Sequence, residues 1–499
     1  MSEFTELSGL PLSTITRRLP PSEATGLRTG ARHRLAQLYR PADLVVLGLG
    51  ATIGAGIFSI AGVQAATAAG PGVLLSFMIA GIACLLAALC YAELSSTMPT
   101  SGTAYTFAYV IFGEVWAWVI GWALILELQL ASAVVAKAWS LYAAQLLTDF
   151  GIRLPYPEAF SNGFALFILA LLTGIVSLGA HVGLRALWVI VGAKLLAIAA
   201  VLVVGAMHID VANFGDFFVE AKPSPTPPDT VLEVVFGQSQ TFGWFGVFAA
   251  ASAIAFAYIG FDLVTTAAEE TVNARRAVPK GVIRSLVIAT VIYLGVAIVM
   301  IGMVPYAQID VDAPLSGAFK IAGVDWMVHV IDIGAVLGLT TVILVLLVGQ
   351  TRVMFSMARD GLLPRGLATI SRRFHTPSRV TWVIGVIAML LTQFVPVFTL
   401  QELVVLGALF AYLFVAVGVI VMRRRLPDLE RGFTVPLSPW LPGLSIVATI
   451  WLMINLQVLT WGWFALWMAF GLVAYLLYGK RHSLLAANHA KVGRGRHRR

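Results

Sequence analysis

The chain has 499 residues, of which 59% are hydrophobic and only 12% are charged, and its mean hydropathy is +0.89. Soluble domains carry about 25% charged residues, so this composition excludes a soluble protein and indicates many membrane spans. The net charge of +8 does not indicate nucleic-acid binding, because the basic residues follow the pattern expected of membrane orientation.

A membrane-spanning helix needs about 20 mostly apolar residues. On that basis we predict an all-α polytopic membrane protein. Its N-terminal tail (residues 1–40) lacks the apolar core of a signal peptide, and a basic tail follows at 481–499. Between them the apolar segments predict twelve transmembrane helices, at 43–63, 73–98, 105–147, 162–180, 185–207, 244–268, 283–303, 327–357, 380–397, 403–423, 442–457 and 459–478.

The distribution of basic residues predicts the orientation. With the N-terminus in the cytoplasm, 27 of the 33 lysines and arginines fall in predicted cytoplasmic segments. Cytoplasmic loops are enriched in these residues. We therefore expect a multi-pass plasma membrane protein with both termini in the cytoplasm, its basic tail near anionic lipid and no nucleic-acid partner.

The two cysteines indicate neither a disulfide nor a metal site. Cys84 and Cys90 lie in one apolar segment, a pattern that supports neither a disulfide framework nor a zinc site. No loop cysteine is available for a disulfide-linked partner subunit, and we expect no metal or cofactor.

Two spans contain glycines near the middle of the bilayer. The stretch GLGATIGAGIFSIAG (48–62) has five glycines, and FAYIGFD (256–262) places Gly260 and Asp262 in the sixth span. A glycine inside a helix costs about 1 kcal/mol relative to alanine. Paired interrupted spans indicate an inverted-repeat transporter, and the freed N–H and C=O groups suit a zwitterion. Close helix packing at small residues is the alternative explanation.

Four stretches resemble the amino acid–polyamine–organocation superfamily, specifically bacterial members of its cationic amino acid transporter branch. They are LGATIGAGIF, FAYIGFDLVTTAAEETVNARRAVPKGV, GQTRVMFSMARDGLLP and the block ELVVLGALFAYLFVAVGVIVMRRRLPDLERGFTVPLSP at 402–439. The resemblance implies a LeuT-type fold in a transporter domain at 41–480. Its inverted repeats of five spans would cover about 41–210 and 240–425, with spans 1 and 6 broken and peripheral spans at about 442–478.

The resemblance also implies a substrate site at the two breaks. The substrate carboxylate would bind the backbone N–H groups of Gly54, Ala55 and Gly56. The amino group would bind backbone carbonyls of Ile53, Phe256, Ala257 and Ile259. The ring of Phe256 would close over the substrate.

Lys194 lies in the fifth predicted span, where Arg185 is the only other charge within ten residues. Ionisable residues at this depth are costly and mark functional sites. The resemblance implies that this lysine takes the place of a sodium ion that sodium-driven relatives hold between spans 1 and 8. It therefore implies coupling to protons. The alternative is a lysine whose stem reaches to the interface.

Glu127 lies in the third predicted span, where the resemblance implies that a glutamate faces the substrate cavity. It would bind a cationic side chain, influence the proton on Lys194, or remain an interior carboxyl. The chain has Ala123 where relatives often have aspartate, which leaves no second acid to support cation binding.

Charged residues in the inner halves of spans 2, 6 and 8 are candidates for gating at the cytoplasmic mouth. Structural ion pairs that hold the loops are the alternative. The residues are Glu93, Asp262, Glu269, Glu270, Arg352 and Asp360.

We expect a secondary transporter that imports L-amino acids with protons by alternating access. By the resemblance, Leu339 contacts the substrate side chain, and its bulk favours small neutral amino acids. A cationic amino acid or polyamine antiporter is the main alternative, and a non-transporting nutrient sensor on the same fold is another. An enzyme is not expected, because no H-E-x-x-H, G-x-S-x-G or P-loop pattern occurs.

Overall fold

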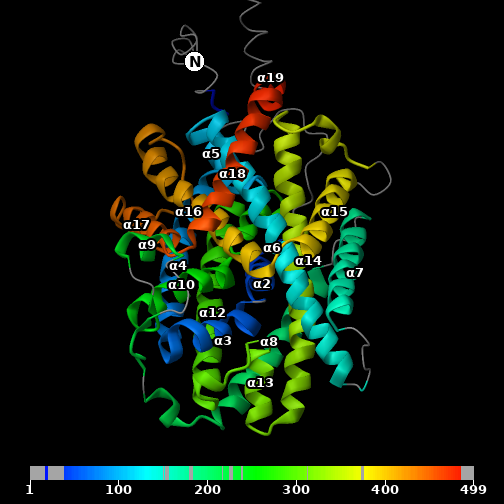
Figure 1. Cartoon of the computed structure of the whole chain (residues 1–499). Coiled ribbons are helices and arrows are strands. Elements are labelled where there is room, and N and C mark those ends of the chain that lie inside the picture. Colours follow the sequence, from blue (N-terminus) through cyan, green and yellow to red (C-terminus); the bar gives the residue numbers. More distant parts are fainter. Residues whose placement is uncertain are drawn as a thin grey trace, which may run out of the picture.

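The computed structural model describes residues 17–20, 39–54, 56–149, 151, 157–178, 184–215, 217–223, 229–237, 240–311, 313–371 and 376–484. Ala55, one of the predicted binding residues, lies outside these ranges. The described chain is predominantly helical (Figure 1).

The longer helices are α2 (Pro41–Thr52), α4 (Val73–Thr97), α6 (Glu114–Asp149), α7 (Pro157–Ser177), α8 (Leu184–Ala206), α10 (Gly243–Tyr258), α12 (Ala274–Met303), α14 (Asp325–Arg359), α15 (Ser378–Phe394), α16 (Val397–Arg425), α17 (Trp440–Ile454) and α18 (Val458–Ala474). The shorter α-helices are α3 (Ala61–Gln64), α5 (Thr103–Ile111), α9 (Val231–Phe236), α11 (Leu263–Thr266), α13 (Pro314–Ile321) and α19 (Lys480–His482).

Shorter helical turns and one strand pair complete the fold. The π-helical turns are η3 (Gly56–Ile60), η4 (Ala65–Ala69) and η10 (Tyr475–Gly479). The 3₁₀ turns are η5 (Gly70–Gly72), η6 (Val211–Phe214), η7 (Ala268–Glu270), η8 (Tyr306–Gln308) and η9 (Arg365–Ala368). Strands β1 (Lys222–Pro223) and β2 (Gln240–Thr241) pair antiparallel, with Lys222 opposite Thr241.

Helix α6 forms the centre of the molecule. It packs against α14, α16 and α7. In its most apolar stretch of 18 residues, 94% are buried inside the protein, whereas in the most apolar stretch of 458–482 only 22% are buried. A helix that is apolar on all sides is stable in such an interior position. Polar side chains in the middle of α6, such as Glu127 and Gln129, therefore face other parts of the protein.

The predicted spans correspond to helices, but several of their limits differ: α12 begins at Ala274 and not at 283, and α16 begins at Val397 and not at 403. Among the described residues, eight helices are long and apolar enough to cross a membrane, and four shorter apolar helices accompany them. The count of twelve crossings therefore remains a prediction. The segment expected as one long span at 105–147 is divided into α5 and α6, because the chain turns at Gly113 with φ +114°. That left-handed conformation favours glycine.

The described ends of the chain meet at one end of the molecule (Figure 1). The N–H of Glu114 donates to the carbonyl oxygen of Arg17 at 2.8 Å, and the hydroxyl of Ser483 donates to the Glu114 carboxylate at 2.6 Å. We call this end the tail face and define it by residues 17–20, α5, Glu114 and Ser483. Helix α2 starts on this side and runs toward the interior, where it packs against α8, α12 and α14.

Candidate functional site

The first helix is interrupted at the predicted glycines. Helix α2 ends at Thr52, Ile53 is extended with ψ 100°, and helical structure resumes at Gly56. If Gly54 carried a side chain, its Cβ atom would lie 2.8 Å from Cγ2 of Val342. Cβ atoms in real proteins essentially never approach another heavy atom closer than 3.0 Å. The glycine therefore lets the break fit against α14.

The sixth predicted span is interrupted in the same way. Helix α10 ends at Tyr258, Ile259 is extended, and Gly260 has φ +114° before α11 begins at Leu263. A Cβ on Gly260 would lie 3.0 Å from the backbone of Ala51. The prediction of paired breaks at these residues is confirmed.

The two breaks lie directly against each other. A Cβ atom on Gly56 would lie 2.2 Å from Cβ of Ala257, a separation that no pair of real side chains tolerates. Residues about 200 positions apart in the sequence are therefore brought together with their backbones in contact. This arrangement brings the ends of two half-helices together at one place, and such ends leave backbone groups without helical partners.

Tyr293 of α12 joins the two breaks through one hydroxyl group. Its Oη atom lies 2.7 Å from the carbonyl oxygen of Thr52 and 2.8 Å from that of Ala257, so it donates to the end of either half-helix. Sequence reasoning missed this residue. A tyrosine in an apolar span offers only a weak signal, because tyrosines are common at membrane interfaces.

Lys194 is fully buried on α8 and points at the end of α2. Its Nζ atom donates to the carbonyl oxygens of Ile53 at 2.9 Å and Gly50 at 3.2 Å, and lies 3.4 Å from Oγ1 of Thr341 on α14. The carbonyl end of a helix carries a partial negative charge that favours a cation. The structure places the ammonium group between α2 and α14, the first and eighth predicted spans.

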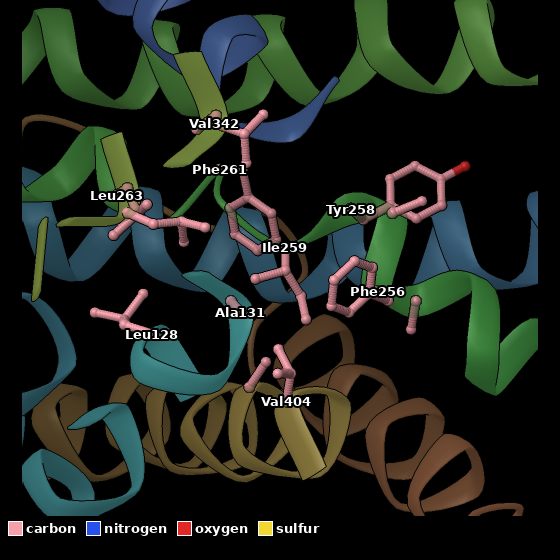
Figure 2. Close-up of a cluster of buried hydrophobic side chains, with 14 of the residues drawn as sticks. Leu128, Ala131, Phe256, Tyr258, Ile259, Phe261, Leu263, Val342 and Val404 are labelled. Carbon is pink, nitrogen blue, oxygen red and sulfur yellow. The ribbon is translucent and has the colours of Figure 1, made fainter. Parts of the chain in front are cut away.

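Apolar side chains line the breaks. Leu339 is fully buried, and Phe256 and Ile259 are 6% and 7% exposed. Figure 2 shows Ile259 and Phe256 beside Ala131 of α6 and Val404 of α16. A Cβ on Gly54 would lie 3.7 Å from Cδ2 of Leu339, so this leucine borders the first break. A ligand side chain at this place would meet an aliphatic surface.

Beyond this surface lies a group of buried polar side chains, which we call the carboxyl cluster: Tyr91, Glu127, Asp262 and Tyr412. Both carboxylate oxygens of Glu127, Oδ1 of Asp262 and the two phenol oxygens make no hydrogen bond within the described part of the chain. Glu127 and Asp262 interact electrostatically, and the two tyrosine rings meet edge to face with centroids 5.7 Å apart. Buried polar groups are normally hydrogen-bonded, so this cluster stands out chemically.

Close to the breaks, on the side of the tail face, an ion pair joins two helical segments. Arg352 of α14 donates to Glu270 at 2.6 Å and to the hydroxyl of Thr266 at 3.1 Å. Glu269 instead accepts hydrogen bonds from the N–H and hydroxyl of Ser101, each at 3.0 Å. Arg352 and Glu270 therefore join α14 to the segment that follows α11.

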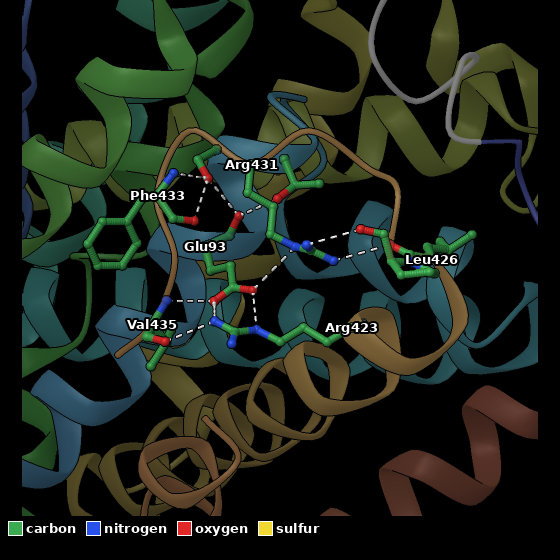
Figure 3. A network of polar contacts seen from close by, with 9 residues as sticks. Glu93, Arg423, Leu426, Arg431, Phe433 and Val435 are labelled. Atoms are coloured by element: carbon green, nitrogen blue, oxygen red, sulfur yellow. Dashed lines mark hydrogen bonds and ion pairs between the residues drawn. The ribbon is translucent and has the colours of Figure 1, made fainter. Parts of the chain in front are cut away.

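Glu93 makes a different kind of contact. Its fully buried carboxylate accepts two hydrogen bonds from Arg423, at 2.7 and 2.5 Å, and one from the N–H of Val435 at 2.7 Å. Arg431 approaches to 3.7 Å (Figure 3). These contacts hold the segment after α16 against α4. The gating role expected of Glu93 stays a prediction.

A cleft of about 330 Å³ lies on the other side of the breaks from the tail face. Its walls come from the part of the first span that follows the break, from α10 and from the start of α16, together with α9, β2 and the residues after α17. They include Gln64, Ala253 and Val405. Because α16 ends near the tail face, its residues 401–405 lie toward the end of that helix that is away from the tail face. The cleft borders the half of the first span that follows the break, and the ion pair between Arg352 and Glu270 lies on the side of the tail face.

Comparisons with known proteins cover almost the whole chain. The sequence model of a family described as amino acid permease matches residues 42–481. A branched-chain amino acid permease of Bacillus subtilis is 42% identical over 455 residues, which cover 89% of this chain and 93% of that protein. A methylthioribose transporter of the same organism is 39% identical over 460 residues, covering 90% and 95%. The vacuolar cationic amino acid transporter 2 of Arabidopsis thaliana is 34% identical over 423 residues, covering 83% and 64%.

Proposed function

The chain belongs to the amino acid permease family, and from this premise we propose that it is a secondary transporter that moves L-amino acids across the plasma membrane by alternating access. The proposal includes a LeuT-type arrangement of two five-helix inverted repeats, at about 41–210 and 240–425, with both termini cytoplasmic. The observation that carries it is the contact between the two helix breaks at Gly56 and Ala257. Interrupted helices at the repeat interface are the usual substrate sites of such transporters.

The substrate backbone would bind at the half-helix ends. The N–H groups of Gly54, Ala55 and Gly56 would receive the carboxylate. Helical structure resumes at Gly56, and the dipole of a helix favours an anion at its start. Carbonyl oxygens of Ile53, Phe256, Ala257 and Ile259 would receive the amino group. Those of Ile53 and Ala257 already accept one hydrogen bond, from Lys194 and Tyr293. Each carbonyl has a second lone pair for the substrate.

The side-chain site favours neutral aliphatic substrates. Leu339, Ile259 and Phe256 are buried and apolar, and an aliphatic substrate side chain loses water at no polar cost there. The bulk of Leu339 favours small neutral amino acids. The branched-chain permease named among the relatives makes valine, leucine and isoleucine the next class to test.

Proton coupling would act through Lys194. As an ammonium group it bonds to the carbonyl end of α2 next to Ile53. Loss of its proton would remove the positive charge that stabilises this helix end. The break would then be free to change its geometry together with the substrate carbonyls. This links the protonation state of one residue to the shape of the substrate site.

Alternating access would require the tail face to open. The ion pair between Arg352 and Glu270 spans α14 and the segment after α11. We propose that it breaks when the substrate leaves toward the cytoplasm, and that the cleft on the opposite side closes. Asp262 and Glu269 would move with this segment. The movement of Glu269 would act on its hydrogen bonds to Ser101.

Uptake into proteoliposomes tests the proposal. The buffer is sodium-free with an inward proton gradient, and the radiolabelled panel is alanine, serine, leucine, lysine, arginine, putrescine and methylthioribose. Accumulation of alanine or leucine supports neutral amino acid transport. Failure of every amino acid to enter, or to exchange in counterflow, refutes transport and favours a sensor.

A second candidate function is exchange of cationic amino acids. The observation that favours it is the Glu127 carboxylate, which is buried without a hydrogen bond in the described chain and would pair with a cationic side chain. Uptake of only lysine, arginine or putrescine in the same panel would support this exchange and refute the neutral assignment.

A further inference from the structure

A small cavity of about 160 Å³ lies at the tail face, away from the helix breaks. Its floor is apolar and comes from the ends of α5 and α16, with Val110, Ile111 and Met422 among its residues. Two arginines, Arg18 and Arg425, line it as well. The cavity thus joins an apolar floor to two positive charges.

Arg18 is held in place by the residues on both sides of it. The carbonyl oxygen of Arg17 accepts a hydrogen bond from the N–H of Glu114 at 2.8 Å, and the N–H of Leu19 donates to Tyr109 at 3.2 Å. The side chain of Leu19 is 8% exposed and belongs to the core. The segment is therefore docked on α5, which fixes the backbone from which the guanidinium of Arg18 extends.

The two guanidinium groups share the cavity without a carboxylate in its wall. Among the described residues that line the cavity, none is acidic. Partial burial and the positive charge of Arg425 lower the pKa of Arg18. The neighbouring Arg423, by contrast, is neutralised by Glu93. Two like charges at one cavity repel each other, and an anion between them would relieve that repulsion.

The cavity lies at the depth of a membrane interface. Trp116 is 43% exposed on α6, its ring is 5.4 Å from that of Phe414 on α16, and tryptophans of this kind mark the headgroup level. Trp116 follows Glu114 by two residues, and the N–H of Glu114 bonds to the carbonyl oxygen of Arg17, so this level lies beside Arg18. A long arginine side chain at the end of such a helix reaches back to lipid headgroups.

We propose that Arg18 and Arg425 form a binding site for a phosphate-bearing anion, supplied by the headgroup of an anionic phospholipid in the leaflet at the tail face. Guanidinium groups bind phosphate oxygens through paired hydrogen bonds. The site would tie the N-terminal segment and the end of α16 to one lipid. It is independent of the substrate site and of the proposed transport mechanism.

The test is thermal unfolding and native mass spectrometry of the purified full-length protein. The probes are phosphatidylglycerol, phosphatidylcholine and inorganic phosphate, added separately. The variants are Arg18→Gln, Arg425→Gln and the matched control Arg424→Gln, an exposed arginine that does not line the cavity. Each cavity arginine that is removed is expected to weaken phosphatidylglycerol binding about fivefold, and the control is expected to bind like the wild type.

Arg18→Gln keeps the test valid if Arg425→Gln does not fold, because Arg18 lies outside the helical core. Stronger stabilisation by phosphatidylglycerol than by inorganic phosphate supports the lipid as the source. The reverse order supports the same anion site with a soluble phosphate as its ligand. Equal binding of phosphatidylcholine and phosphatidylglycerol, or equal losses in all three variants, would overturn the proposal.

Discussion

The Nζ atom of Lys194 lies 2.9 Å from the backbone carbonyl oxygen of Ile53, the residue that directly follows helix α2. The two residues are 141 positions apart in the chain. A single hydrogen bond therefore links the only lysine of α8 to the backbone that we propose as the substrate site. This contact gives a physical route by which proton binding would affect substrate binding.

Lys194→Ala should abolish proton-driven accumulation of substrate. The variant removes the ammonium group that stabilises the carbonyl end of α2, so a pH gradient no longer acts on the break. The measurement is uptake with and without the gradient, beside counterflow exchange at equal pH. Lys137→Ala is the matched control, because Lys137 bonds to Asn162, away from the breaks. Normal accumulation by Lys194→Ala would refute proton coupling through this residue.

Gly56→Ala should destabilise the protein and stop transport. The added Cβ would lie 2.2 Å from Cβ of Ala257, and overpacking of this kind costs about 1–3 kcal/mol. The measurement is the melting temperature together with substrate uptake. Gly174→Ala is the control, because a Cβ there meets no atom within 4 Å. Unchanged uptake by Gly56→Ala would show that the half-helices do not cross as closely as described.

Tyr293→Phe should raise the KM for uptake about tenfold while the protein stays folded. The variant removes one hydroxyl that donates to the carbonyl groups of Thr52 and Ala257. Leaving a buried acceptor unsatisfied costs about 1–3 kcal/mol. Tyr258→Phe is the control, since its hydroxyl bonds to Phe77 and not to either break. An equal change in KM for both variants would contradict a specific role for Tyr293.

Arg352→Gln should open the tail face more often. The ion pair with Glu270 is largely sheltered, with side chains 17% and 12% exposed, so its loss matters more than that of a surface pair. A Thr265→Cys reporter on α11, buried in this structure, should react faster with a thiol reagent from the tail side. Native Cys84 and Cys90 are buried and are replaced by alanine in all variants.

Arg275→Gln provides the comparison for this measurement. Arg275 pairs with Glu430 at the surface, where the side chains are 42% and 83% exposed. Its loss should leave the labelling rate of the reporter unchanged. Equal labelling rates in Arg352→Gln and the wild type would argue that the Arg352–Glu270 pair does not gate access.

Local features of the sequence predicted the helical segments and both breaks. Apolar length and glycine content depend on a few neighbouring residues, so the residue order alone locates the interruptions at Gly54 and Gly260. The limits of α5 and α6 were harder to predict, because Gly113 lies inside an apolar run and only its backbone conformation reveals the turn.

The partners of the charged and polar residues were decided by the tertiary structure. Arg423 meets Glu93 across 330 residues, and Tyr293 meets Thr52 across 241. No local pattern distinguishes Glu269 from Glu270, yet Arg352 bonds to Glu270. Spans form from the free energy of burying apolar side chains, which is a sum over neighbouring residues. Hydrogen bonds and ion pairs require atoms within about 3 Å, and only the packing of distant helices sets those distances.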